Sequence, residues 1–138
     1  MINKNLNLNK LKKKKINFRK FLIKNTNLNI SEITRLSYDL QSGSYIKSYN
    51  ILKKNKKKYN IFYENMKNLI KNIKGKEVKT ILDFGTGEGI KLPYILRFSK
   101  KIKKIYACDI SFNRLCYAFD FLKKELSQKK LSKIFLFC

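Results

Sequence analysis

The chain has 138 residues, of which 33 are Lys or Arg and 9 are Asp or Glu, so its formal net charge is +24. A chain of this length holds one domain at most. It contains no histidine, which excludes a histidine-dependent catalytic triad, a histidine metal site and a haem with a histidine ligand. No apolar run approaches the length of a membrane-spanning helix. The N-terminal residues lack the apolar core of a secretory signal, so we expect a cytoplasmic protein without a membrane partner.

The positive charge has two explanations. Lysines and arginines bind polyanions such as nucleic acids. However, five residue types with A/T-rich codons (Lys, Asn, Ile, Phe and Tyr) account for 79 of the 138 residues, and only 4 of the 33 basic residues are Arg. Arginine is the residue that recognises phosphate and guanine bidentately. Codon composition therefore explains the charge better than nucleic-acid binding does. Cys108, Cys116 and Cys138 have neither disulfide-framework nor zinc-ligand spacing, and we expect free thiols.

Three segments are predicted along the chain. Residues 1–30 are rich in Asn and Lys, carry little apolar surface and are expected to form a basic mobile arm. Residues 31–77 are predicted to be helical. Ser31 is the expected N-cap of a first helix that ends near residues 41–44, and a longer helix is expected from about Ser48 to Ile73, with Gly75 as its stop signal.

Residues 78–138 change to an alternation of strands and helices. Apolar runs predict strands at 78–84, 102–108 and 134–137, and helices are predicted at 90–98 and 112–127. The order β-α-β-α-β predicts an α/β fold with a parallel sheet and right-handed crossovers. Thr80 to Phe84 is expected to present an unpaired apolar edge.

The sequence Asp83-Phe84-Gly85-Thr86-Gly87-Glu88-Gly89 stands between the first strand and the first helix of this alternation. Glycines at these positions permit a sharp turn and a close approach of a ligand to the backbone. Asp109 follows the second strand, where a carboxylate accepts hydrogen bonds from the hydroxyls of a ribose. The pattern therefore indicates a nucleoside site.

The spacing excludes two common phosphate-binding loops. A dinucleotide fingerprint needs a third glycine where this chain has Ile90, and a P-loop needs Gly-Lys-Ser/Thr where it has Gly89-Ile90-Lys91. An NAD-dependent oxidoreductase is therefore disfavoured. The acidic side chains of Asp83 and Glu88 suit a ligand that carries an ammonium group better than one that carries phosphates.

With this loop, Ile81 to Gly89 resembles the first motif of the class I (Rossmann-like) S-adenosylmethionine-dependent methyltransferases, and Tyr106 to Ser111 resembles the second. The resemblance implies a Rossmann-like sheet, S-adenosyl-L-methionine as cofactor, and transfer of a methyl group to a small-molecule or sugar acceptor. It further implies a role for each of the following residues. Asp83, Gly85, Thr86, Gly87 and Gly89 would hold the methionine part, Asp109 the ribose, Ile110 the adenine, and Tyr45, from a segment similar to one upstream of the first motif, would close over the cofactor.

Members of this family continue their sheet past the third strand, so we expect residues 78–138 to be an incomplete domain, from a truncated gene product or a split enzyme whose second chain completes the sheet. The catalytic residues are not identifiable on this basis. Two alternatives stay open. One is a basic nucleic-acid-binding protein that uses Lys10 to Lys24 and the Lys53 to Lys58 cluster, with the glycine sequence as a mere turn. The other is a methyltransferase fragment that acts on RNA.

Overall fold

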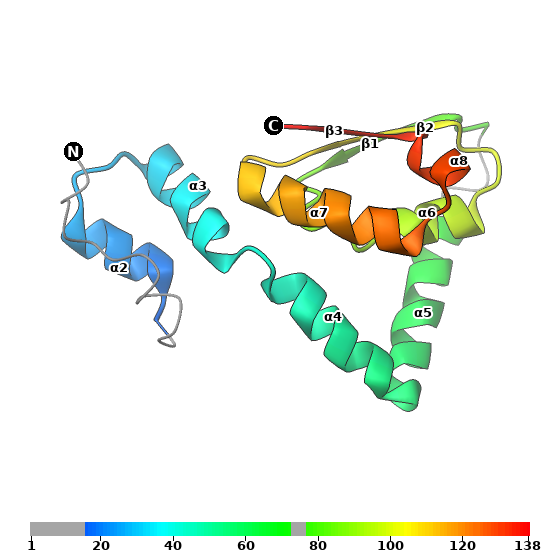
Figure 1. Ribbon diagram of the computed structural model, residues 1–138, viewed down its shortest axis with the longest axis horizontal. Coiled ribbons are helices and arrows are strands. Elements are labelled where there is room, and N and C mark those ends of the chain that lie inside the picture. Colours follow the sequence, from blue (N-terminus) through cyan, green and yellow to red (C-terminus); the bar gives the residue numbers. More distant parts are fainter. Residues whose placement is uncertain (1–15, 73–76) are drawn as a thin grey trace. The chain divides into compact units, whose positions relative to one another are not determined.

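The computed structural model describes residues 16–72 and 77–138, which form two compact units, one ending at Ser42 and the other beginning at Gly43 (Figure 1). The predicted glycine stop signal at Gly75 and the lysine run 12–15 lie outside the described residues.

The first unit contains two helices, α2 (Phe18–Asn25) and α3 (Ile30–Gln41). Leu22 of α2 is buried together with Ile33 and Leu40 of α3, so the expectation of a mobile arm is wrong for this part of the chain. The reason is that even a short amphipathic helix can be stable when a second helix packs against its apolar side chains and completes a small core. The α3 N-cap is Asn29 rather than Ser31, and its side chain forms a capping box with Glu32.

The second unit begins with α4 (Ser44–Lys54) and α5 (Lys56–Lys71), where the sequence predicted one longer helix. The break lies at Asn55, whose side chain accepts a hydrogen bond from the Lys58 amide at 3.0 Å. Asparagine offers the backbone a side-chain acceptor in place of a helical one, and it therefore ends one helix and caps the next.

Three parallel strands follow, and they confirm the predicted α/β fold. The chain order is β1 (Thr80–Phe84), α6 (Leu92–Phe98), β2 (Lys104–Cys108), α7 (Phe112–Glu125), α8 (Gln128–Leu131) and β3 (Ile134–Phe137). The strand order is β1-β2-β3, so β1 is an edge strand among the described residues, as predicted. The short helix α8 was not predicted.

One face of the sheet is covered by helices. Figure 1 shows α6 and α7 along the same side of the strands. Ile105 and Ala107 of β2 are fully buried against this layer, in a core that also holds Leu92, Leu122 and residues of α4 and α5. Tyr94 stands at the centre of the aromatic part of this core, with its hydroxyl in hydrogen-bond contact with those of Tyr49 and Tyr59.

The other face carries exposed apolar side chains, since successive residues of a strand point to opposite sides. This open face consists of Leu82, Phe84, Tyr106, Phe135 and Phe137. The register aligns Leu82 with Tyr106 and Phe135 in one row and Phe84 with Phe137, across Cys108, in the next. Phe84 is the most exposed of the five, at 87%.

Candidate functional site

The glycine loop, Gly85 to Gly89, starts at the carboxyl end of β1. The amides of Gly85 and Thr86 both donate to the carbonyl oxygen of Cys108, each at 2.9 Å, which ties the start of the loop to the end of β2. Gly85, Gly87 and Gly89 have φ angles of 75°, 61° and 68°. Residues with a Cβ rarely adopt these angles, so the backbone conformation explains why glycine recurs at alternate positions.

Asp109 connects this loop to the helix that follows β2. Its Oδ2 accepts a hydrogen bond from the Gly87 amide at 2.8 Å, and its Oδ1 accepts one from the Ser111 amide at 2.9 Å. Ser111 is the N-cap of α7, and its Oγ accepts from the amide of Arg114 at 3.2 Å. The carboxylate that the sequence predicted to bind a ribose is therefore buried at the centre of the site, and each of its oxygens keeps a second acceptor position.

Glu88 has a different position from the one its sequence context suggested. Its side chain is buried, and its carboxylate accepts hydrogen bonds from the amides of Gly43 and Ile46 at 2.8 Å each and from that of Tyr45 at 3.4 Å. These amides belong to the first turn of α4, whose N-cap, Gly43, has no side chain to offer. The carboxylate therefore caps a helix, a role that the sequence did not indicate.

A pocket of about 210 Å³ lies against the glycine loop. Its lining consists of Tyr45, Gly85, Thr86, Gly87, Glu88, Ile90, Lys91 and Arg114. This loop pocket is smaller than the 300–1,000 Å³ typical of sites that enclose a whole drug-sized ligand. Its size suits one end of a larger molecule.

Four of the predicted site residues line this pocket, namely Tyr45, Gly85, Thr86 and Gly87. The other four predicted residues do not line the pocket. Asp83 is half-buried in β1, and Gly89 packs against α7. Asp109 accepts a hydrogen bond from the loop, and Ile110 is exposed just after β2. The loop pocket also contains a residue that the sequence analysis missed, Arg114. The available signal was its position three residues after Ser111, the last residue of the second motif and a typical N-cap.

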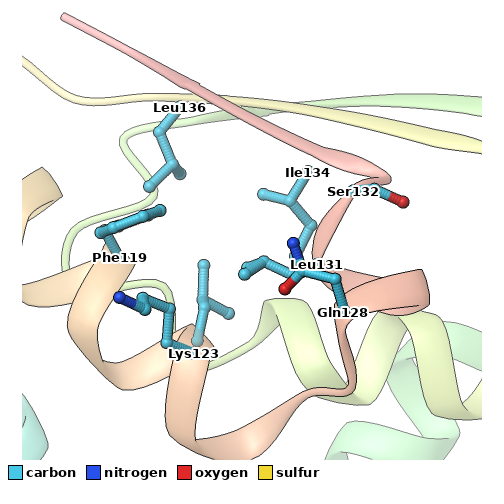
Figure 2. A pocket seen from close by; sticks show the side chains of 8 residues that line it. Phe119, Lys123, Gln128, Leu131, Ser132, Ile134 and Leu136 are labelled. Atoms are coloured by element: carbon cyan, nitrogen blue, oxygen red, sulfur yellow. The ribbon is translucent and has the colours of Figure 1, made fainter.

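Two further hollows lie along α7 and β3, away from the loop. The larger, about 670 Å³, is lined mainly by apolar side chains that include Phe119, Leu131 and Leu136 (Figure 2). A second of about 490 Å³ shares Phe119 and Leu136 with it. The lining of the second hollow also includes Cys116, Asp120 and Cys138, but the described residues contain no cluster of three side chains that could hold a metal ion. The loop pocket is therefore the better candidate site.

Within residues 16–72 and 77–138, none of the helices has the length and apolarity that crossing a bilayer requires. No protein-family model matches the chain, and no curated protein matches it.

Among the solved structures similar to the chain are two crystal structures of methyltransferase domains. The methyltransferase domain of bacterial CtHen1-C is 29% identical with a TM-score of 0.48, and the match covers 54% of this chain and 38% of that one. The methyltransferase domain of bacterial CtHen1-CN is 30% identical with a TM-score of 0.47, and the match covers 53% and 38%. The matched region thus spans well under half of each solved chain.

Proposed function

We propose that this chain binds S-adenosyl-L-methionine through the glycine loop and Asp109, and that it is the cofactor-binding part of a class I methyltransferase. The observation that carries the proposal is the hydrogen bond between Asp109 and the amide of Gly87 at the carboxyl end of two neighbouring parallel strands. Ligands of open α/β sheets bind at this edge. A nucleoside that meets the loop there comes within reach of the Asp109 carboxylate.

The space beside the loop supports the fit of such a ligand. A Cβ placed on Gly85 would meet no protein atom within 4 Å, and one on Gly87 would meet only the Arg114 side chain, at 3.9 Å. The backbone is therefore open to close approach on this side, which is the function of glycine in a ligand-binding loop. When bound, S-adenosyl-L-methionine supplies a methyl group on a sulfonium.

The chain's own residues act mainly by positioning. The glycine loop and Asp109 would hold the side of the ligand that lies against the protein backbone. Tyr45, in the first turn of α4, borders the same pocket. Methyl transfer depends on an in-line approach of the acceptor more than on an acid or base, so orientation is the larger contribution. We propose a small-molecule or sugar acceptor, in keeping with the sequence around Tyr45.

Isothermal titration of the purified full chain tests the proposal. S-adenosylhomocysteine, the demethylated product, is expected to bind with an affinity that changes little with ionic strength, and NAD⁺ is expected not to bind. Asp120→Ala, a substitution of an exposed carboxylate on α7, serves as a control that keeps the affinity of the wild type. No binding of S-adenosylhomocysteine to a folded, monodisperse wild-type chain would refute the proposal.

A second candidate function, nucleic-acid binding, is favoured by one observation, the net charge of +24. Binding through lysines releases counterions, so the affinity for a single-stranded RNA of mixed sequence would fall steeply between about 50 and 200 mM salt. An RNA affinity with this dependence, together with S-adenosylhomocysteine binding, would support an RNA acceptor in place of a small molecule. RNA binding without any binding of S-adenosylhomocysteine would support the second function alone.

A further inference from the structure

The larger hollow along α7 and β3 has an apolar floor built from three elements. The floor consists of Phe119 and Leu122 of α7, Leu131 of α8, and Ile134 and Leu136 of β3. Its volume of about 670 Å³ lies within the range of about 300–1,000 Å³ that is typical of small-molecule sites. Its described lining shares no residue with that of the loop pocket. The hollow is therefore a second place where a ligand can bind.

The floor of this hollow is incompletely packed. Leu131, Ile134 and Leu136 are half-buried, and Phe119 is 48% exposed. Protein interiors ordinarily pack as densely as organic crystals, so apolar side chains around a hollow of this size lack part of their usual contacts. An apolar ligand that covers them removes their surface from water, which is favourable. The hollow thus suits an alkyl chain.

A positive charge stands at one end of the hollow. Of the described residues that line it, Lys123 alone carries a charge. Its ammonium lies 5.2 Å from the centre of the Phe119 ring, and Figure 2 shows the two side chains beside each other. The three ion pairs among residues 16–72 and 77–138 use other cations. A carboxylate at this end would therefore find a cation that no neighbouring acid holds.

The smaller hollow has the opposite charge, because its charged lining residue is Asp120. An anionic head group is repelled there and attracted at Lys123, so the two hollows favour different ligands. We propose that the larger hollow binds a medium-chain fatty acid, with the alkyl chain on the apolar floor and the carboxylate at Lys123. This site goes beyond the proposed function and does not depend on it.

Amphiphiles that share a tail and differ in the head group test the site. Isothermal titration of the purified full chain uses decanoate, decanol and decyltrimethylammonium, each below its critical micelle concentration. We expect decanoate to bind saturably at one site and more tightly than decanol, and decyltrimethylammonium to bind least. Each methylene that the hollow buries should raise the affinity by about fourfold, so that octanoate binds about fifteenfold more weakly than decanoate.

Lys123→Met keeps the aliphatic stem of the side chain and removes its charge. We expect it to weaken decanoate by about threefold to tenfold, the range for a partly exposed charged contact, and to leave decanol within about twofold of the wild type. Lys124→Met removes the next lysine of α7, which does not line the hollow, and it should leave both affinities unchanged. Equal losses of decanoate affinity in the two variants would overturn the inference, because they would indicate attraction by the overall charge.

A second pair of variants locates the tail. Phe119→Ala removes part of the floor and should weaken decanoate and decanol alike. Phe135→Ala removes a phenylalanine that is 43% exposed on the open face, and it should weaken neither. A loss in Phe135→Ala that equals or exceeds the loss in Phe119→Ala would place the alkyl chain on the open face and overturn the inference. An absence of saturable decanoate binding to the folded wild type would overturn it as well, whereas the binding of S-adenosylhomocysteine is a separate measurement.

Discussion

Asp109 and Gly87 are joined by a hydrogen bond of 2.8 Å from the Gly87 amide to Oδ2 of the buried carboxylate. This bond links the loop after β1 to the segment after β2, and the second oxygen extends the link to Ser111 at the start of α7. One side chain thus holds three pieces of backbone at the carboxyl edge of the sheet. Both the stability of the site and its proposed binding of an adenosine depend on it.

Asp109→Ala is expected to have two effects. The free energy of unfolding should fall by about 1–3 kcal/mol, because two buried amides lose a charged acceptor. The affinity for S-adenosylhomocysteine should fall by a further factor that corresponds to about 1–3 kcal/mol, the value of hydrogen bonds to a charged partner. Urea denaturation and isothermal titration measure the two separately.

Asp120→Ala, on the exposed side of α7, is the matched control and should change neither quantity. If Asp109→Ala lowers stability but binds S-adenosylhomocysteine as tightly as the wild type, then the carboxylate serves the loop only. The ribose assignment would then be wrong.

Glu88→Gln tests the link between the glycine loop and α4. The amide keeps one acceptor oxygen, but it loses the negative charge at the helix N-terminus and turns donors toward the amides of Gly43 or Ile46. We expect the free energy of unfolding to fall by about 1–3 kcal/mol in urea denaturation. Glu64→Gln removes a carboxylate from an exposed pair with Lys67 and should cost less than about 1 kcal/mol. Equal losses in the two variants would contradict the capping role.

The predicted parts of the fold share one property, which is that their signal is local. The strand that ends at Phe84, the turn at Gly85 to Gly89 and the strand that ends at Cys108 each follow from a short run of residues. Such features are readable because the neighbours that decide them are adjacent in sequence.

The parts that were missed depend on distant partners. Glu88 caps a helix that begins 44 residues earlier in the sequence, and Leu22 becomes buried only because α3 faces it. Arg114 joins the loop pocket through Ser111 and Asp109, a relationship that appears only once β1 and β2 are paired. Charge and helical spacing give no indication of which acid or base will be buried.

Two glycine substitutions separate backbone strain from crowding in the loop. A Cβ on Gly85 meets nothing within 4 Å, whereas one on Gly89 would lie 3.2 Å from the Ala118 Cβ and 3.5 Å from a methyl of Leu92. Both positions have positive φ, which costs a side chain about 1–2 kcal/mol. Gly85→Ala should therefore show about that loss in urea denaturation, and Gly89→Ala should lose more, since α7 must move.

The comparison fails if the two variants are equally stable. That result would mean that the backbone angle alone decides the cost and that the loop does not pack tightly against α7.

The open face of the sheet predicts self-association. All-parallel sheets are found almost only with both faces covered, and this face exposes five large apolar residues with Phe84 at its edge. Phe84→Lys should shift the full chain toward monomer in size-exclusion chromatography with light scattering. Ile51→Lys places the same charge at an exposed position on α4 and should leave the distribution unchanged. Equal shifts would indicate a general effect of charge.

The hydrogen-bonded hydroxyls of Tyr49, Tyr59 and Tyr94 predict that the protein loses stability at alkaline pH. Burial raises the pKa of Tyr94 far above its ordinary value of 10.0, and the contacts with the Tyr49 and Tyr59 hydroxyls raise it further. Above about pH 10, tyrosines of the unfolded chain lose protons that the folded chain keeps. The folded state then binds more protons, so the free energy of unfolding falls as the pH rises.

Tyr94→Phe removes this group. Between about pH 10 and pH 11, the free energy of unfolding should then fall less steeply, by up to about 1.4 kcal/mol per pH unit. Urea denaturation across this range measures the slope, which is independent of any constant loss from the missing hydrogen bonds. Tyr106→Phe, on the open face, provides the control for removing one phenol. If Tyr94→Phe keeps the wild-type slope, then the Tyr94 hydroxyl reaches water in the folded chain and the packing of α4 and α5 against α6 is looser than the structure shows.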